Sequence, residues 1–222
     1  MPNTGPIAGI VLAAGMSRRL GRPKQLLKIG DAYILNRVVD AALKSELDNV
    51  TLVLGHCRDE IQAILGERLN APRLKLVRNP DYRRGQSRSL HHGVRAVRSG
   101  FPACMFILAD QPLLDTATIN LLIEHFYRSD RGICVPRCHG QRKNPTLFNS
   151  TYYNRLLSIS GDTGAQGIIA SQPEDVLYID VERPDVFLDV DTPEDLVRVE
   201  TLFQKSRQVE HKAREDHQND HT

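Results

Sequence analysis

Short apolar runs alternate with amphipathic segments along most of the chain, which is the pattern that βαβ units give around a largely parallel sheet. The apolar runs that we expect to form strands are Ile7–Leu12, Val50–Leu54, Leu74–Val77, Cys104–Leu108, Ile133–Val135 and Val176–Ile179. Between them, apolar residues recur at helical spacing over 34–42 and 119–126, and a third helix is expected from Ser87 or Ser89 through Val97. The hydrophobic pattern therefore predicts an α/β fold with a mostly parallel central sheet.

A final helix is expected to begin at Thr192, where Thr192-Pro193-Glu194-Asp195 offers an N-cap, a proline in the first turn and an acid three residues on. Residues 204–222 include four basic, four acidic and three histidine residues and have almost no apolar periodicity. We expect this segment to fray or to be disordered. The 222 residues are thus expected to form one domain over 1–203 and a charged tail over 204–222.

The composition excludes several classes of protein. The chain is 41% hydrophobic and 25% charged, as in ordinary globular domains, and it has no run of about 18 apolar residues such as a membrane span needs. Residues 1–9 lack the basic and long apolar regions of a signal peptide, so we expect a cytoplasmic protein. The four cysteines are too scattered for a disulfide scaffold, and we expect them to be reduced.

The net charge of +2 hides two basic segments. Residues 1–30 carry five basic residues and no acid, and residues 73–98 carry eight basic residues and one acid, so that these segments sum to +12 and the rest of the chain to −10. A nearly balanced total argues against nonspecific nucleic-acid binding, whereas concentrated positive charge favours a local anionic ligand such as phosphate. For any single arginine, the alternative is a solvated surface position.

The first basic segment directly follows the first predicted strand. The strand ends in Leu12-Ala13-Ala14-Gly15, and Arg19, Gly21 and Lys24 come next. Small residues at such a turn let a ligand approach the backbone, whose N–H groups can bind phosphate oxygens. The segment lacks the Gly-Lys-Ser/Thr of a P-loop and the Gly-x-Gly-x-x-Gly of a dinucleotide fold. We favour phosphate binding here over a plain strand-to-helix turn with exposed cations.

Carboxylates stand at two further places that lead into a helix. Asp110 comes at the carboxyl end of a predicted strand, the edge at which open α/β sheets bind ligands. Asp115 is better placed to cap the helix that follows, which leaves Asp110 free to bind a hard cation such as Mg²⁺. Asp189 and Asp191 precede the last predicted helix, and capping alone is the alternative explanation for either of them.

Together these segments resemble the nucleotidyltransferases that have a GT-A-like Rossmann fold. Three more motifs resemble the molybdenum cofactor cytidylyltransferases of the MobA-like NTP transferase family, namely Gly85-Gln86-Ser87-Arg88-Ser89-Leu90, Asn144-Pro145-Thr146-Leu147-Phe148 and Gly161-Asp162-Thr163-Gly164-Ala165. The resemblance covers about residues 7–203, with the motifs in the right order. It implies a single Rossmann-like three-layer α/β/α domain of the nucleotide-diphospho-sugar transferase type.

The resemblance also implies roles for individual residues in binding the nucleotide CTP. The residues that it assigns to nucleotide binding are Leu12, Ala13, Ala14, Gly15, Arg19, Lys24, Gln86, Ser87, Ser89 and Asp110. Lys24, Arg19 and Asp110 would be the catalytic residues, because they offset charge on the phosphates directly or through a metal ion. Related guanylyltransferases have a second glycine where this chain has Ala14, which favours CTP over GTP.

The metal ligands and the acceptor site follow from the same resemblance. Mg²⁺, or alternatively Mn²⁺, would be bound by Asp110 together with Asp191 or, as a second choice, Asp189. The residues that would contact the acceptor, a molybdopterin-type cofactor, are Asn144, Pro145, Gly161, Asp162 and Gly164. Relatives usually have glycine before the corresponding Asn-Pro or His-Pro pair, whereas this chain has Lys143. Lys143 either binds the phosphate of the acceptor or indicates a different phosphorylated acceptor.

The implied activity is transfer of CMP from CTP to the terminal phosphate of molybdenum-molybdopterin, which gives the molybdopterin cytosine dinucleotide cofactor and pyrophosphate. That phosphate is already an anionic nucleophile, so the reaction needs positioning and charge neutralisation more than a general base. Three alternatives stay open: CTP- or GTP-dependent transfer to an alditol or sugar phosphate, guanylyl transfer to the pterin, and a cofactor carrier for a molybdoenzyme. We expect a monomer that contacts a molybdoenzyme transiently, without nucleic-acid or membrane partners.

Overall fold

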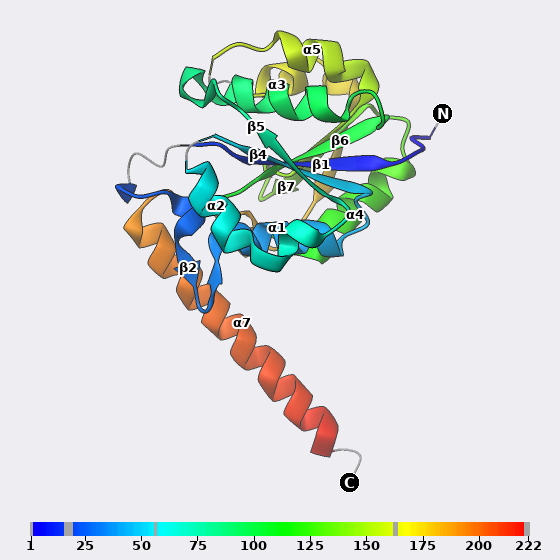
Figure 1. Cartoon of the computed structure of the whole chain (residues 1–222). Coiled ribbons are helices and arrows are strands. Elements are labelled where there is room, and N and C mark those ends of the chain that lie inside the picture. The colour runs from blue at the N-terminus through cyan, green and yellow to red at the C-terminus, as the bar shows by residue number, and fades with distance from the viewer. Residues whose placement is uncertain (1, 16–19, 56, 162–163, 220–222) are drawn as a thin grey trace.

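The computed structural model describes residues 2–15, 20–55, 57–161 and 164–219, with 209–219 described by their backbone alone. Its centre is an eight-stranded sheet in the order β10-β7-β9-β6-β1-β4-β5, with β8 paired to β7 (Figure 1). The strands of this sheet are β1 (Ile7–Ala13), β4 (Asn49–Leu54), β5 (Leu74–Arg78), β6 (Ala103–Leu108), β7 (Ile133–Cys138), β8 (Gln141–Arg142), β9 (Thr146–Asn149) and β10 (Val176–Asp180). A separate hairpin joins β2 (Lys28–Ile29) to β3 (Ala32–Tyr33).

Most neighbouring strands of the large sheet are parallel. β1 lies between β4 and β6 and is parallel to both, and the pairs β4–β5 and β7–β10 are parallel as well. β9 is inserted antiparallel between β6 and β7. The predicted α/β fold with a mostly parallel sheet is therefore confirmed, and so are all six predicted strands. The sequence analysis did not identify β9, whose residues it assigned only to an acceptor motif.

Helices cover both faces of the sheet and make three layers (Figure 1). Their bounds are α1 (Ile34–Lys44), α2 (Arg58–Leu65), α3 (Gln86–Val97), α4 (Thr116–Tyr127), α5 (Tyr153–Ser158), α6 (Gln166–Ala170) and α7 (Pro193–Asn219). The alternation of side chains along β1 explains the layers. Ile7 and Val11 belong to the buried cluster under α1 and α4, whereas Ala8 and Ile10 belong to the cluster under α3, α5 and α6.

A glycine lets α3 lie close to the central strands. A Cβ at Gly93 would stand 2.4 Å from Cγ2 of Ile10 in β1 and 3.4 Å from Cγ2 of Val53 in β4. The first distance is shorter than real carbon contacts allow, so the helix can sit this near to the sheet only where the side chain is absent. The close packing places the start of α3 beside the carboxyl ends of β1 and β4, where the sequence predicts the site.

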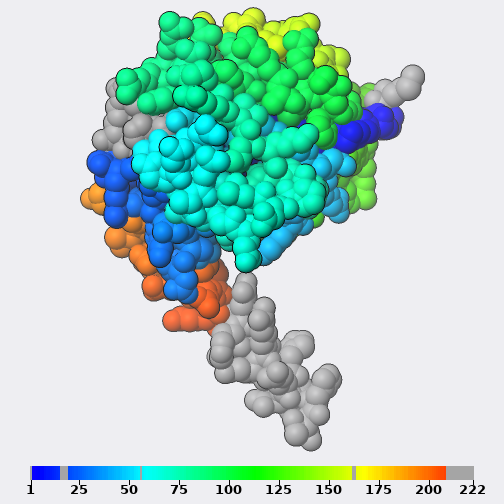
Figure 2. All heavy atoms as spheres, viewed as in Figure 1, coloured from blue at the N-terminus to red at the C-terminus, as the bar shows by residue number. Residues whose placement is uncertain are grey.

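The start of α7 packs against the small hairpin. Val199 of α7 shares a buried cluster with Ile29 and Ile34, and Figure 2 shows the orange start of this helix against the blue segment that holds β2 and β3. The predicted cap is confirmed, because Thr192 Oγ1 accepts the Asp195 N–H over 3.2 Å while Asp195 Oδ2 accepts the Thr192 N–H over 2.9 Å. The segment before α7 is thereby fixed to the domain.

The structure continues α7 to Asn219, which differs from the expectation of fraying or disorder after 203. Phe203 still contacts the domain, because the guanidinium of Arg37 stacks over its ring at 3.8 Å from the centroid. Beyond it the helix extends away from the domain (Figure 1), and its many Gln, Lys, Arg and Glu residues favour a helix without an apolar face. A division of the chain at 203 stays a prediction. Across the described residues, we find no helix with the length and apolar character that crossing a membrane requires.

Candidate active site

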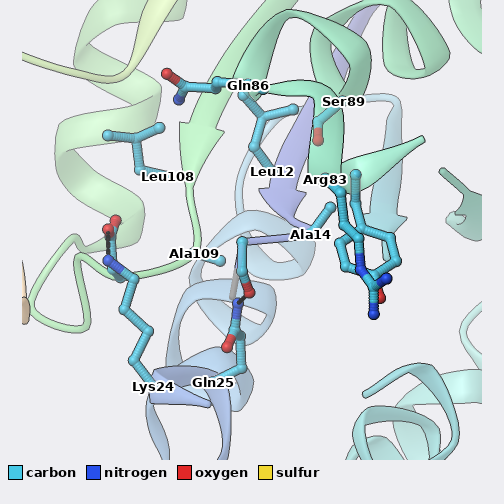
Figure 3. A pocket seen from close by; sticks show the side chains of 13 residues that line it. Leu12, Ala14, Lys24, Gln25, Arg83, Gln86, Ser89, Leu108 and Ala109 are labelled. Carbon is cyan, nitrogen blue, oxygen red and sulfur yellow. Dashed lines mark hydrogen bonds and ion pairs between the residues drawn. The ribbon is translucent and has the colours of Figure 1, made fainter. Parts of the chain in front are cut away.

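A cavity of about 380 Å³ opens at the carboxyl ends of β1 and β6, the edge where α/β sheets bind ligands. The residues that line this first pocket are Leu12, Ala14, Gly15, Lys24, Gln25, Tyr82, Arg83, Gly85, Gln86, Ser89, Leu108, Ala109 and Asp110 (Figure 3). Seven of them are residues that the sequence analysis assigns to nucleotide binding. The structure therefore brings together the turn after β1, the start of α3 and the loop after β6.

A buried amide holds the turn that follows β1. Gln25 lies in the short 3-10 turn Lys24–Leu26 and is only 2% exposed. Its Nε2 donates to the carbonyl of Ala13 over 3.1 Å and to the carbonyl of Gly15 over 3.4 Å. Gln25 thus fixes the backbone on both sides of Ala14, in the turn that we expect to bind phosphate. Arg19, the other predicted phosphate ligand of this turn, lies outside the described residues.

Lys24 connects two of the predicted metal ligands. Its Nζ donates to Asp110 Oδ2 in a short ion pair and to Asp191 Oδ1 over 2.8 Å. Burial by itself lowers the pKa of Lys24, but the two carboxylates outweigh burial, so that the pKa stands above its ordinary value. Lys24 is therefore a charged ammonium that draws the loop after β6 and the segment before α7 together.

Asp189 adds a third carboxylate beside this pair. Gln111, which is 2% exposed, donates from Nε2 to Asp189 Oδ1 over 2.9 Å. The backbone N–H of Val190 donates to the carbonyl of Asp110 over 3.0 Å and fixes the two segments to each other. Burial, followed by the negative charges of Asp110 and Asp191, raises the pKa of Asp189 to about 6. The charged form of such a carboxyl is one that a nearby cation stabilises.

Other residues cap the helices that follow these carboxylates. Asp115 caps α4 by accepting a backbone N–H over 2.8 Å, as predicted. Thr192 and Asp195 cap α7, and Asp195 Oδ2 also accepts the backbone N–H of Asp191 over 3.1 Å. Helix capping, the alternative explanation for Asp189 and Asp191, is therefore supplied by their neighbours.

Asp110 has an oxygen that can serve a cation. Its Oδ1 is buried and has no hydrogen-bond partner among the described residues. In the same part of the chain, no three His, Cys, Asp or Glu side chains are grouped so that they alone could hold a metal ion. This donor set fits Mg²⁺ or Mn²⁺, since such hard cations bind one or two carboxylates and complete their coordination with waters and substrate phosphates.

The start of α3 forms the wall across the pocket from Lys24 (Figure 3). Gly85 has a φ of 103°, which a residue with a side chain rarely adopts, and this conformation turns the chain into the helix. Ser89 is 6% exposed, and its Oγ accepts a hydrogen bond from Asn79 Nδ2 over 2.9 Å. Arg83, in the short 3-10 turn Tyr82–Arg84 that precedes Gly85, adds a cation at this wall. The pocket thus has cations on both sides.

A second pocket of about 250 Å³ adjoins the first, and the two share Leu12, Gln86 and Leu108. The other residues that line the second pocket are Leu90, Phe106, Asn144, Thr146, Phe148, Gly164, Ala165, Gln166 and Ile169. The rings of Phe106 and Phe148 meet edge to face with their centroids 5.9 Å apart. The paired cavities combine a charged compartment with one whose wall has aromatic and aliphatic side chains together with the amides of Gln86, Asn144 and Gln166.

Two of the predicted acceptor residues lie on the wall of the second pocket. Asn144 and Gly164 line this pocket. Gly161 is exposed and does not line this pocket, but its carbonyl accepts the Ser87 N–H over 3.2 Å and joins this loop to the start of α3. Asp162 lies outside the described residues. The structure therefore brings the acceptor motifs next to the nucleotide motifs.

Some predicted residues lie behind the walls, and some wall residues were not predicted. Ala13 and Ser87 are buried behind the first pocket, and Pro145 follows Asn144 through a cis peptide bond. The functional candidates that sequence reasoning missed are Gln25, Tyr82, Arg83, Phe106, Gln111 and Phe148. The position of Gln25 directly after Lys24 was the one local signal among these, because the others depend on how distant segments pack.

Known proteins match this chain over almost its whole length. Residues 9–176, which include the entire lining of both pockets, match the family model of the MobA-like NTP transferase domain. The purine catabolism protein PucB of Bacillus subtilis (strain 168) is 31% identical over 200 residues, which cover 86% of this chain and 96% of that protein. The molybdenum cofactor cytidylyltransferase of Escherichia coli (strain K12) is 25% identical over 194 residues, which cover 87% and 95%.

Solved structures show the same fold. Rv0371c of Mycobacterium tuberculosis H37Rv, determined in complex with manganese, superposes with a TM-score of 0.72 at 27% identity. The match covers 88% of this chain and 98% of that one. The similarity thus extends to the whole three-layer domain and includes a protein that binds a divalent metal ion.

Proposed function

The chain belongs to the family of MobA-like NTP transferase domains and is a nucleotidyltransferase, and from this premise we propose that it transfers CMP from CTP to the terminal phosphate of molybdenum-molybdopterin. The products are the molybdopterin cytosine dinucleotide cofactor and pyrophosphate. Support for the cytidylyl group comes from the similarity to a molybdenum cofactor cytidylyltransferase and from Ala14 in the turn after β1. The coarser activity, nucleotidyl transfer, follows from the family itself.

The observation that carries the proposal is the shared wall of the two pockets. Leu12, Gln86 and Leu108 border both of them, so a group held in the first pocket lies next to a group held in the second. The first pocket has the charged residues that a triphosphate needs, and the second combines aromatic side chains with side-chain amides, which suits a flat ring system with polar edges. A transferase requires this arrangement, because the reacting atoms of its two substrates must be held together.

The charged residues of the first pocket match the demands of phosphoryl transfer. Attack by an anionic phosphate on the α-phosphorus of CTP needs no general base, but negative charge develops on the departing pyrophosphate. Lys24 is a donor in this pocket whose pKa its carboxylate partners hold above the ordinary value, and Arg83 adds a second cation to the wall. We assign Arg19 to the same task from the family resemblance. These side chains offset charge and orient the phosphates.

A divalent ion fits the proposed reaction, and Asp110 would hold it together with Asp191 or Asp189. When bound, the ion supplies positive charge that stabilises the transferring phosphate and the leaving pyrophosphate. The chain itself prepares these ligands: Lys24 holds Asp110 and Asp191 close together, and Gln111 orients Asp189. The manganese complex of a related fold supports metal use in general.

The second pocket supports a pterin-type acceptor. Its aromatic wall suits a planar ring, and the Asn144 amide supplies a polar group at the same wall. Thr146 Oγ1 donates to Asn144 Oδ1 over 3.4 Å, which leaves the Nδ2 group of Asn144 to donate to an acceptor oxygen. Lys143 directly precedes this residue, and its backbone N–H is fixed to the carbonyl of Pro136 over 2.8 Å. We assign the Lys143 ammonium to the phosphate of the acceptor.

The proposal is tested by incubating the protein with molybdenum-molybdopterin, MgCl2 or MnCl2, and each of the four NTPs. We expect a cytosine dinucleotide product by mass spectrometry together with an equal amount of pyrophosphate, and loss of both on chelation of the metal. A GTP-dependent product with none from CTP would overturn the assignment of the base. The same panel with alditol and sugar phosphates tests the acceptor, since a product formed only with these would overturn the pterin.

Pyrophosphate release also separates the enzyme from a cofactor carrier. A carrier binds the pterin cofactor but needs neither a cation for the leaving group nor a metal ligand at Asp110. Binding of the cofactor without pyrophosphate release from any NTP would therefore support a carrier and contradict the proposed transfer.

A further inference from the structure

Gln25 makes contacts that a nucleotide site would use. It is 2% exposed, it lines the first pocket, and its Nε2 donates to the carbonyls of Ala13 and Gly15 over 3.1 and 3.4 Å. These two carbonyls flank Ala14 in the turn after β1. Carbonyl groups only accept hydrogen bonds, so the amide must turn its NH2 group toward them, and the orientation of the side chain is determined by its contacts.

The oxygen of the same amide shows that this orientation of Gln25 lowers the stability of the fold. Gln25 Oε1 is buried and has no hydrogen-bond partner among the described residues. A buried acceptor without a partner destabilises a protein by about 1–3 kcal/mol, and an apolar side chain of similar size would avoid this loss. What distinguishes Gln25 is the place of its contacts, because its amide holds the two carbonyls that flank Ala14 at the wall of the first pocket.

Control of the carbonyls is also control of the N–H groups that face a phosphate. A trans peptide unit is planar, and its N–H points opposite to its C=O. Fixing the Ala13 carbonyl therefore fixes the direction of the Ala14 N–H, and Ala14 lines the first pocket. Donors that are oriented before the ligand arrives bind it more tightly, because less conformational entropy is lost on binding.

We propose that Gln25 is a positioning residue for the triphosphate: by holding the Ala13 and Gly15 carbonyls, it keeps the turn after β1 in the conformation that binds phosphate oxygens. The inference rests on the proposed function in so far as the ligand of this turn is a triphosphate. It does not depend on the base or on the acceptor.

The test uses inorganic tripolyphosphate, which has the phosphate chain of an NTP without its nucleoside. Its affinity for the wild-type protein and for Gln25→Met is measured by isothermal titration calorimetry in the presence of MgCl2. Methionine keeps the length of the side chain and removes the donor. The matched control is Asn36→Leu in α1, because Asn36 is also a buried amide that donates to one backbone carbonyl, Ile64, over 2.8 Å and has an unpartnered Oδ1 among the described residues.

We expect Gln25→Met to bind tripolyphosphate about tenfold more weakly than the wild type, and Asn36→Leu to bind it with unchanged affinity. Three results would overturn the inference. Gln25→Met could bind tripolyphosphate as tightly as the wild type does, or both variants could bind it equally more weakly. The third such result is that the wild type does not bind tripolyphosphate. Thermal unfolding confirms that each variant is folded, and Gln25→Leu replaces Gln25→Met if that variant does not fold. The NTP panel described above tests the proposed function separately, so failure of one does not mimic failure of the other.

Discussion

Val190 donates its backbone N–H to the carbonyl of Asp110 over 3.0 Å, and this bond joins the loop after β6 to the segment before α7. The two segments are far apart in the sequence, yet the bond holds Asp110 beside the segment that contains Asp189 and Asp191. Lys24, in the short turn Lys24–Leu26, pairs with both Asp110 and Asp191. Asp110 is the residue at which the three segments of the site meet, through its carbonyl as well as its side chain.

Replacing Asp110 should therefore remove catalysis and leave the fold in place. Asp110→Asn keeps the shape of the side chain and leaves the backbone hydrogen bond from Val190 to residue 110 in place. It removes the negative charge that would hold a divalent ion. We expect kcat for nucleotidyl transfer to fall by at least about 100-fold, because electrostatic stabilisation of the transition state has effects of this size. The measurement is pyrophosphate release under saturating NTP, with circular dichroism to confirm folding.

The control for this variant makes the same chemical change at a surface ion pair. Asp180 at the end of β10 pairs with Arg137 over 2.9 and 3.0 Å and has a side chain that is 66% exposed. Asp180→Asn should leave turnover unchanged, because exposed pairs contribute at most about 1 kcal/mol to stability and this one is not part of the pockets. Unchanged turnover in Asp110→Asn would contradict the metal role.

The parts of the site that could be predicted from the sequence are those that a short segment determines. The apolar run of β6 ends at Leu108, and this alone places Asp110 at the ligand-binding edge of a parallel sheet. The small residues after β1 likewise predict a turn that a phosphate can approach. Asp115 and Thr192 are identified as helix caps by their immediate neighbours.

The parts that could not be predicted depend on pairing between distant segments. Phe148 meets Phe106 because β9 inserts antiparallel beside β6, and nothing near either residue specifies this register. The contact of Gln25 with Ala13 joins residues 12 apart in the sequence, and that of Gln111 with Asp189 joins residues 78 apart. The second pocket was therefore expected only through the family resemblance.

Ala14 should influence which base the enzyme accepts. It lines the first pocket and is 3% exposed, so Ala14→Gly removes a methyl group from a tight wall. Family resemblance associates glycine at this place with guanylyl transfer, and we expect the ratio of kcat/KM for GTP to that for CTP to rise by at least about tenfold. Ala109→Gly, which removes the same group elsewhere on the wall, should leave this ratio near its wild-type value. An equal change in both variants would show that Ala14 has no specific role in selection.

Asn144 should act on the acceptor and not on the nucleotide. Its amide is oriented by Thr146 and lines only the second of the two pockets. Asn144→Ala removes a donor that we assign to an acceptor oxygen, and a hydrogen bond to a charged group is worth about 1.5–3 kcal/mol. We expect KM for the pterin acceptor to rise about tenfold or more while KM for CTP changes less than twofold. A parallel rise of both KM values would place Asn144 in the nucleotide site or in a general structural role.

Gly93 should resist even the smallest added side chain, although it lies within a helix, where alanine is intrinsically better by about 1 kcal/mol. An added Cβ would be 2.4 Å from Cγ2 of the fully buried Ile10, so α3 or β1 must shift to admit it. We expect Gly93→Ala to lower the free energy of unfolding by about 1–3 kcal/mol, measured by urea denaturation. Gly167 in α6 is the matched control, because a Cβ there meets nothing within 4 Å, and Gly167→Ala should raise the same free energy by about 0.5–1 kcal/mol. Opposite signs for one substitution in two helices would show that contact with the sheet, and not helix propensity, determines the residue at 93, whereas stabilisation of both variants would contradict the close approach of α3.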